Sequence, residues 1–172
     1  AIRNDMGEME LLTGNQIGSL LGWYRIKTMF DLGWLTESNR SRAVLVKTLV
    51  TTELQRSIAE KYGINVIDTL TGFKYIGEKL KKYEDAIPNE KKGDYRNLTE
   101  EESRKLRLEY TKFFVFGGEE SYGYLGSDFV RDKDGNASAL MFAELAAFAM
   151  SEGTSIAGLR DRIWGEYGVH LE

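Results

Sequence analysis

Short runs of mostly hydrophobic residues alternate along this chain with longer segments whose hydrophobic residues recur every three or four positions. The runs predict strands over residues 43–46, 64–67 and 113–116, and unbroken runs such as the first and the third are typical of strands buried on both faces. Strands that alternate with helices predict parallel pairing and an α/β layered sheet. The periodic segments predict helices over approximately residues 13–33, 52–62, 71–80, 100–110, 137–150 and 154–167.

Two segments depart from this alternation. Residues 1–12 place hydrophobic residues on both sides of the polar turn Asn4–Gly7, and this arrangement predicts a β hairpin. Residues 81–112 are dominated by Lys, Glu, Asp and Arg and contain the only proline, Pro88. We interpret this second stretch as a charged surface insertion.

Composition narrows the chemistry that the chain can carry. Its 172 residues suffice for one domain with its own core, and its net charge is −4. The absence of cysteine excludes disulfides, zinc ribbons and thiol nucleophiles, and the single histidine, His170, excludes multi-histidine metal sites within this chain. Mild acidity without a basic cluster argues against nucleic-acid binding, and the longest hydrophobic stretch, residues 137–150, is too short to cross a membrane. We therefore expect a cytoplasmic protein that works through carboxylates, lysines, hydroxyls and backbone amides.

Three candidate sites follow from the topology of the predicted sheet. In open parallel sheets, ligands bind beyond the carboxyl ends of the strands. This rule selects Lys47, the segment Thr71–Lys74 and the segment Gly117–Gly123, each of which follows a predicted strand. The lysines also have structural interpretations, Lys47 as a strand-end residue whose ammonium reaches water and Lys74 as part of a solvated helix face. On these residues alone, both interpretations stay open.

The sequence GEESYG at residues 118–123 carries the most chemistry. A carboxylate accepts hydrogen bonds through two oxygens, so one glutamate can hold two neighbouring hydroxyls of a sugar ring. Ser121 adds a donor or an acceptor, and the flanking glycines let the backbone approach a ligand closely. A solvated surface turn with two glutamates is the alternative interpretation.

Several longer motifs occur in a fixed order and point to a family. They are LLTGNQ at residues 11–16, VKTLVTT at 46–52, DTLTGFKYIG at 68–77, GEESYGYL at 118–125 and FVRDKD at 129–134. Together they resemble the third domain of the phosphohexomutases, the phosphoglucomutase and phosphomannomutase enzymes, and most closely its bacterial phosphoglucomutase branch. The resemblance covers residues 11–167. It implies a three-layer α/β/α sandwich around a small, mostly parallel, mixed sheet of about four strands.

The resemblance also implies a division of labour between domains. Residues 1–12 would end the preceding, second domain, and residues 13–172 would form the third, sugar-recognition domain. The family's enzymes are isomerases (intramolecular phosphotransferases) that interconvert hexose 1-phosphate and hexose 6-phosphate through an intermediate of the glucose 1,6-bisphosphate type. Their phosphoserine and their Mg²⁺ loop lie in other domains. We therefore expect no catalytic residue and no metal ligand in this chain, and no activity from it alone.

The substrate contacts are likewise implied by the resemblance. Glu119 and Ser121 would hold sugar hydroxyls, with Gly118 beside them. Phe73 and Lys74 would belong to the specificity loop, and Lys47 would face the reacting phosphate. The implied partners are a sugar phosphate and the other domains of the same chain, with no nucleic acid and no membrane.

Two alternatives remain beside a phosphohexomutase domain. One is a standalone carbohydrate-phosphate binding module without catalysis, and the other is an interaction domain that uses the charged residues 81–112. The start at Ala1 without an initiator methionine suggests a fragment of a longer protein. The closing Leu171 and Glu172 are compatible with either a native or a cloning origin.

Overall fold

The computed structural model describes residues 1–4 and 6–170, so Asp5 of the predicted turn and the closing Leu171 and Glu172 lie outside the described residues. Its strands are β1 (Ile2–Arg3), β2 (Met9–Glu10), β3 (Ala43–Thr48), β4 (Asn65–Thr69), β5 (Phe113–Gly118) and β6 (Tyr124–Leu125). Its α-helices are α1 (Gly14–Asp31), α2 (Leu54–Lys61), α3 (Phe73–Asp85), α4 (Asn89–Lys92), α5 (Glu100–Tyr110), α6 (Gly135–Ser151) and α7 (Ile156–Tyr167). Two 3-10 turns occupy Arg40–Arg42 and Tyr95–Asn97.

One mixed, mostly parallel sheet organises the domain. Its strand order is β4-β3-β5-β6, with β3 parallel to both β4 and β5, and β6 antiparallel to β5. The predicted α/β class and a sheet of about four strands are therefore confirmed. The connection from β4 to β5 passes over β3, and α3, α4 and α5 form this crossover.

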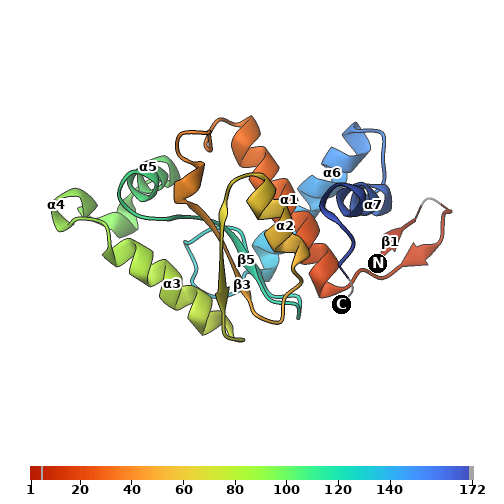
Figure 1. Cartoon of the computed structure of the whole chain (residues 1–172), viewed down its shortest axis with the longest axis horizontal. Helices are drawn as coiled ribbons and strands as arrows, with labels where there is room; N and C mark the ends of the chain where they lie inside the picture. Colours follow the sequence, from red (N-terminus) through yellow and green to blue (C-terminus); the bar gives the residue numbers. More distant parts are fainter. Residues whose placement is uncertain (5, 171–172) are drawn as a thin grey trace.

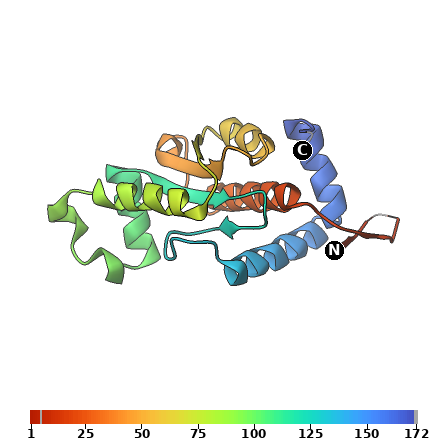
Figure 2. The ribbon, with the colours of Figure 1, turned by 90° about the horizontal axis from the view of Figure 1, so that it is seen from below.

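Helices cover both faces of the sheet, which gives the three expected layers (Figures 1 and 2). Alternation along β3 explains why: Leu45 belongs to the core shared with α1 and α2, whereas Val44 and Val46 belong to the core shared with α3. The first core is larger because α6 and α7 also pack against it. All six residues of β3 are buried, as a strand covered on both faces requires.

The sequence patterns missed parts of all four strands of this sheet. β4, expected over residues 64–67, continues through Asp68 and Thr69. β3 continues through Lys47 and Thr48, and β5 continues through Gly117 and Gly118, where we expected the hydrophobic runs to end both strands. The expected polar loop after β5 contains β6, whose two residues are buried. Hydrophobicity marks the covered middle of a strand, whereas backbone pairing carries the strand further along its neighbour.

The charged residues 81–112 are more than a surface insertion. Their first five residues are the last turns of α3, so the change in composition falls inside a helix. Glu84 and Arg107 are buried, and α5 packs against β5. The expected helix at residues 100–110 is confirmed, and it starts with a capping box between Thr99 and Glu102.

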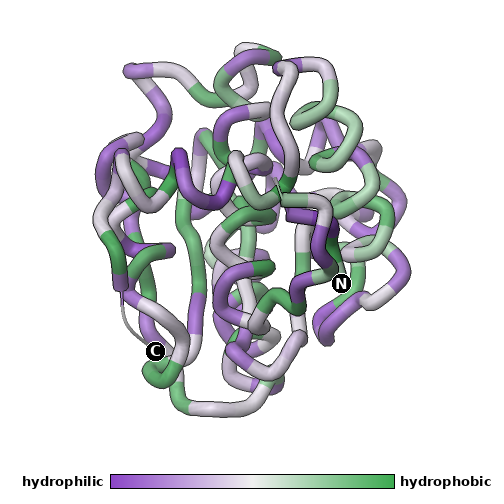
Figure 3. The backbone as a smooth tube through the Cα atoms, turned by 90° about the vertical axis from the view of Figure 1, so that its right-hand side faces the viewer, coloured by the Kyte–Doolittle hydropathy of each residue, from purple (hydrophilic) through white to green (hydrophobic). Residues whose placement is uncertain are grey.

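The predicted hairpin at residues 1–12 forms, with Ile2 paired to Glu10 and Arg3 paired to Met9. It projects from the end of the molecule opposite α4 (Figure 1). Seen from the hairpin end, the backbone alternates between hydrophobic and hydrophilic residues along its helices (Figure 3), as packing on one face requires.

The start of α1 touches the turn that follows β5. A Cβ atom added to Gly14 would lie 1.7 Å from the carbonyl oxygen of Glu120, so only glycine fits there. One turn further on, a Cβ on Gly18 would lie 2.7 Å from the side-chain Nε2 of Gln55 and 3.0 Å from the ring of Tyr124. Small residues one helical turn apart thus let α1 approach the sheet edge closely.

We predict that Gly14→Ala lowers the free energy of unfolding by about 1–3 kcal/mol, because the new methyl group forces the backbone of the turn to move. Gly165→Ala is the matched control, because a Cβ at this position of α7 meets nothing within 4 Å. Alanine there should raise stability by up to about 1 kcal/mol, since glycine is the poorer helix former. Urea unfolding measures both variants. Equal stability of Gly14→Ala and the wild type would contradict the close contact.

Candidate functional site

Three loops meet at one edge of the sheet because β3, β4 and β5 are parallel. In this register Lys47 lies opposite both Asp68 of β4 and Gly118 of β5. The loops that follow the three strands, residues 49–53, 70–72 and 119–123, therefore leave the sheet side by side. Hydrogen bonds connect them across this edge, from the Leu49 amide to the Thr69 carbonyl (2.9 Å) and from the Thr51 hydroxyl to the Gly118 carbonyl (3.5 Å).

The carboxylate of Glu119 connects the turn after β5 to the start of α3. Its Oε1 accepts a hydrogen bond from the Gly72 amide at 2.8 Å, and the residue is only 9% exposed. Gly72 is the N-cap of α3, with φ of 121° and ψ of 124°, a conformation that glycine adopts without strain. A negative charge at a helix N-terminus is stabilised by the free amides and by the helix dipole. Glu119 is therefore held firmly, with its second carboxylate oxygen available for other donors.

Two tyrosines, Tyr122 in this turn and Tyr124 at the start of β6, connect it to the segment that starts α1. The Tyr124 hydroxyl donates to the Gly14 carbonyl at 2.6 Å, and the Tyr122 hydroxyl donates to the Leu12 carbonyl at 3.4 Å. Tyr122 has a φ of +65°, which costs a non-glycine residue roughly 1–2 kcal/mol. The turn is thus held in a strained shape that leaves the Ser121 side chain exposed.

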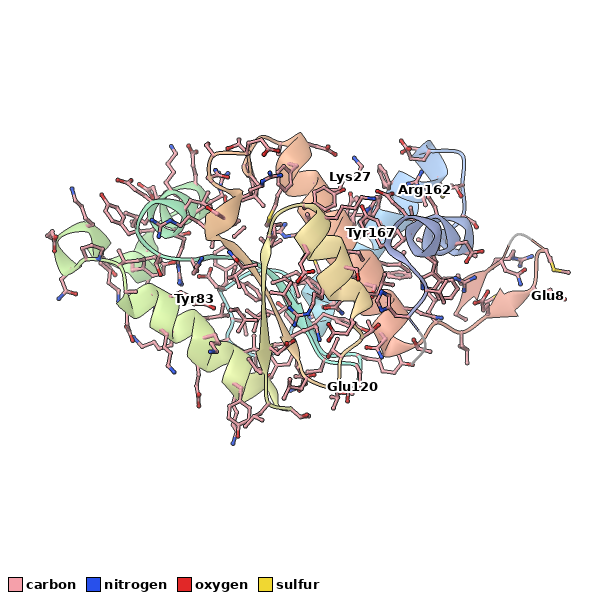
Figure 4. The ribbon with its side chains drawn as sticks, viewed as in Figure 1. Glu8, Lys27, Tyr83, Glu120, Arg162 and Tyr167 are labelled. Atoms are coloured by element: carbon pink, nitrogen blue, oxygen red, sulfur yellow. The ribbon has the colours of Figure 1, made fainter. Side chains whose placement is uncertain are left out.

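Glu120 lies on this same edge of the sheet (Figure 4). Its Oε2 is buried and has no hydrogen-bond partner among the described residues.

Lys47 is fully buried, and its ammonium has three oxygen neighbours, two as hydrogen-bond acceptors and the third as an ion-pair partner. Its Nζ lies 3.0 Å from the Thr51 carbonyl, 2.7 Å from Glu53 Oε1 and 3.1 Å from Asp68 Oδ1. Arg56 bridges the same two carboxylates. The expected strand-end lysine is thus an internal ion-pair centre that connects the loop after β3 to β4. The hydrogen bond from Lys47 lowers the pKa of Glu53 below its ordinary value.

The two predicted residues at the start of α3 differ in their exposure to solvent. Phe73 is buried in the core beneath α3, whereas Lys74 is exposed with its Nζ 4.8 Å from the centre of the Tyr75 ring. A third side chain, Lys133, lies beside them with its Nζ 5.8 Å from the centre of the Phe73 ring. A Cβ on Gly123 would lie 3.3 Å from Glu119 Oε2 and 3.4 Å from the Lys133 side chain, so both line the same small space.

Sequence reasoning missed Lys133, although the residue lies within the quoted motif FVRDKD. Its place beside Glu119 comes from the return of the chain after β6, which carries no hydrophobic pattern. The structure thus brings Gly118, Glu119 and Phe73 together with the aliphatic part of Lys133. Ser121, Lys74 and Lys133 are all exposed, and the Lys133 ammonium pairs with Asp132 Oδ1 at 3.0 Å.

A cavity of about 560 Å³ opens beside the loop after β3, lined by residues 49–53 together with Asn15, Val169 and His170. Within the described part of the chain, no group of three or more His, Cys, Asp or Glu side chains could hold a metal ion. None of the helices in that part is long and apolar enough to span a membrane.

Residues 13–167 match the family model described as phosphoglucomutase/phosphomannomutase, alpha/beta/alpha domain III. Among curated proteins, the chain is 31% identical to a phosphopentomutase of Homo sapiens over 99% of its length, which is 24% of that protein. It is 33% identical to a phosphoglucomutase of Staphylococcus epidermidis over 88% of its length, which is 22% of that protein. The chain thus spans about a quarter of the length of the curated relatives that it matches.

A solved structure with the same fold is the putative phosphomannomutase from Thermus thermophilus. It aligns with a TM-score of 0.59 and 24% sequence identity, over 91% of this chain and 26% of that one.

Replacement of Glu53 tests the ion-pair centre around Lys47. Because the pKa of Glu53 is lowered in the folded state, its contribution to stability is present above the ordinary glutamate pKa of 4.5 and disappears as pH falls through the lowered pKa. Glu53→Gln should therefore reduce stability at pH 7 by up to about 1 kcal/mol, since Glu53 is half exposed and water screens it. This deficit should shrink below pH 4.5.

Urea unfolding from pH 3 to pH 7 measures the effect. Glu78→Gln serves as the control, because Glu78 is exposed on α3 and forms no ion pair with any described residue. A deficit of Glu53→Gln that stayed constant over this pH range would show that Glu53 does not stabilise the fold through its charge.

Proposed function

The chain belongs to the phosphoglucomutase/phosphomannomutase family as an α/β/α domain III, and on this basis we propose that it is the sugar-recognition domain of a phosphohexomutase. The full-length protein would be an isomerase that interconverts hexose 1-phosphate and hexose 6-phosphate. The domain would orient the sugar and would be inactive alone. The observation that carries the proposal is the buried Glu119 carboxylate at the edge where three loops converge.

In this proposal, Glu119 and Ser121 hold adjacent hydroxyls of the sugar ring. Glu119 is suited to the role because its Oε1 is fixed by the Gly72 amide, so the orientation of the carboxylate is set before a ligand arrives. The Ser121 hydroxyl is exposed on the same turn and can both donate and accept a hydrogen bond. Gly123 keeps bulk away from the space beside Glu119, since a Cβ there would lie 3.3 Å from Glu119 Oε2.

Three lysines at the same edge supply positive charge for the phosphate groups. Lys74 follows Phe73 at the start of α3, with its ammonium over the Tyr75 ring. The Lys133 ammonium lies near the Phe73 ring, and a phosphate would compete with Asp132 for it. Lys47 is proposed to face the reacting phosphate, and it would do so by exchanging the Glu53 or Asp68 carboxylate for a phosphate oxygen. Such an exchange replaces one anionic acceptor by another and leaves the buried ammonium paired.

The chemical step itself is assigned to residues outside this chain. Phosphoryl transfer depends mainly on positioning and on charge stabilisation, so one domain can orient the sugar while others provide the phosphoserine and the Mg²⁺ loop. Between its two half-reactions the bisphosphorylated sugar must turn end for end. A carboxylate and a hydroxyl that bind neighbouring ring hydroxyls can serve both orientations. A rigid site that fits only one end of the sugar could not. A relative named glucose 1,6-bisphosphate synthase, from Mus musculus and 28% identical, is consistent with this intermediate.

Glu119→Gln in the full-length protein tests the proposal. Glutamine keeps an oxygen that can accept from the Gly72 amide, so α3 should still start correctly. Loss of the charge should lower kcat/KM for both hexose phosphates by about 10- to 100-fold, since a hydrogen bond to a charged group contributes about 1.5–3 kcal/mol. Glu78→Gln on the exposed face of α3 is the control. Unchanged kinetics in a folded Glu119→Gln variant would refute the assignment.

A standalone binding module for carbohydrate phosphates is the second candidate, since the geometry at Glu119 would serve binding without catalysis. Steady-state assays of the full-length protein on glucose 1-phosphate, mannose 1-phosphate and ribose 1-phosphate separate the two. A phosphohexomutase converts at least one hexose 1-phosphate to its 6-phosphate. Tight binding of a sugar phosphate without any conversion would favour the binding module.

A further inference from the structure

The loop at residues 126–133 brings Lys133 to the candidate site, but hydrophobic packing does not hold it there. Its two large hydrophobic side chains, Phe129 and Val130, are 67% and 47% exposed. Such side chains contribute little burial energy, so the loop depends on other contacts for its position. The strongest of those contacts come from the crossover between β4 and β5.

The first contact is an ion pair between α5 and the loop. Arg107 is buried, and its Nη2 donates to Asp128 Oδ2 at 2.6 Å. The other two guanidinium nitrogens also donate, Nε to the Tyr95 hydroxyl at 2.6 Å and Nη1 to the Leu80 carbonyl at 3.3 Å. A planar guanidinium fixed on three sides has one orientation, so it fixes Asp128 as well.

The second contact lies at the far end of α3. Arg131 of the loop pairs with the buried carboxylate of Glu84. The backbone of Arg131 itself lies directly on α3, since a Cβ on Gly77 would lie 2.7 Å from the Arg131 carbonyl oxygen. A cavity of about 250 Å³ separates the two ion pairs and is lined by residues of both, so the contact between them is not densely packed.

These ion pairs lie far from the sugar site. Glu84 is eleven residues beyond Phe73 on α3, which corresponds to about 16 Å along the helix. Figure 4 shows Tyr83, the neighbour of Glu84, near the end of α3 that lies away from Glu120. From Asp128 and Arg131 the loop continues directly to Lys133, whose aliphatic chain lies beside Glu119 and Phe73. Lys133 follows Arg131 by only two positions, so a shift of one moves the other.

We propose that Arg107–Asp128 and Glu84–Arg131 are positioning ion pairs, through which the charged crossover at residues 81–112 holds Lys133 at the sugar-phosphate site. The proposal rests on the proposed function insofar as it assigns Lys133 a phosphate to meet. It gives the charged residues a role in substrate affinity, although they lie outside the site. None of the four paired residues is expected to touch the substrate.

The test compares single variants of the full-length protein. Asp128→Asn and Arg131→Gln each remove one charge; the first keeps the size of the side chain, and the second keeps a shorter polar one. Asp128→Glu is the conservative variant that should restore function. Glu101→Gln is the matched control on α5, because its ion pair with Lys105 is exposed and does not involve the loop.

Two measurements are made on each variant: amide hydrogen exchange and steady-state kinetics with glucose 1-phosphate. Asp128→Asn and Arg131→Gln should speed exchange at residues 126–134 by at least tenfold and leave exchange in β3 and β5 unchanged. KM should rise by at least fivefold, and kcat should change less than twofold. Asp128→Glu should recover most of the affinity, and Glu101→Gln should match the wild type in both measurements.

The outcomes separate the inference from the proposed function. Unchanged loop exchange in both variants overturns the anchoring role, whatever the kinetics. Faster loop exchange with an unchanged KM overturns the positioning role while leaving a phosphohexomutase intact. Faster exchange that extends to β3 and β5 in both variants means that the pairs serve global stability, which also overturns it. A wild-type protein that converts no sugar phosphate overturns the proposed function and the role of Lys133 with it.

Discussion

The candidate site depends on the parallel pairing of β3 with both of its neighbours. This pairing sets Lys47 beside Asp68 and Gly118 in one row across the sheet. It also makes three loops leave the sheet at one edge, although nearly 70 residues separate the first from the last. The Glu119 carboxylate can cap α3 only because β5 and the start of α3 end up at this edge. An antiparallel β4 or β5 would send its loop to the opposite end of the domain.

Much of this arrangement follows from the sequence. Buried hydrophobic runs identify β3 and β5, and periodicity identifies the long helices. The rule for the carboxyl ends of parallel strands then selects Lys47, Phe73 and Glu119 from the sequence alone. Prediction from the sequence fails where backbone pairing, and not a hydrophobic pattern, defines a strand. Thus β6 and the glycine end of β5 escape prediction, because two buried residues and two glycines leave no periodic signal.

The electrostatic details lie further beyond the sequence. A lysine after a hydrophobic run is compatible with a solvated ammonium, yet Lys47 is buried because Glu53 and Asp68 come from two different elements to pair with it. Glu84 and Arg107 resemble parts of a solvated charged stretch for the same reason, since their partners lie on a loop more than twenty residues away. Because Glu84 and Arg107 are buried and pair with this loop, we infer that the charged crossover helps to position the site.

The central proposal is that this domain binds the sugar through the Glu119 carboxylate, while other domains of the protein perform phosphoryl transfer. A crystal structure of the full-length protein with glucose 1-phosphate bound tests it most directly. We predict that the Glu119 carboxylate accepts hydrogen bonds from two neighbouring sugar hydroxyls, with Ser121 beside it and the Gly72 contact retained. A bound sugar that leaves Glu119 in contact with Gly72 alone, and is held by other residues, would contradict it.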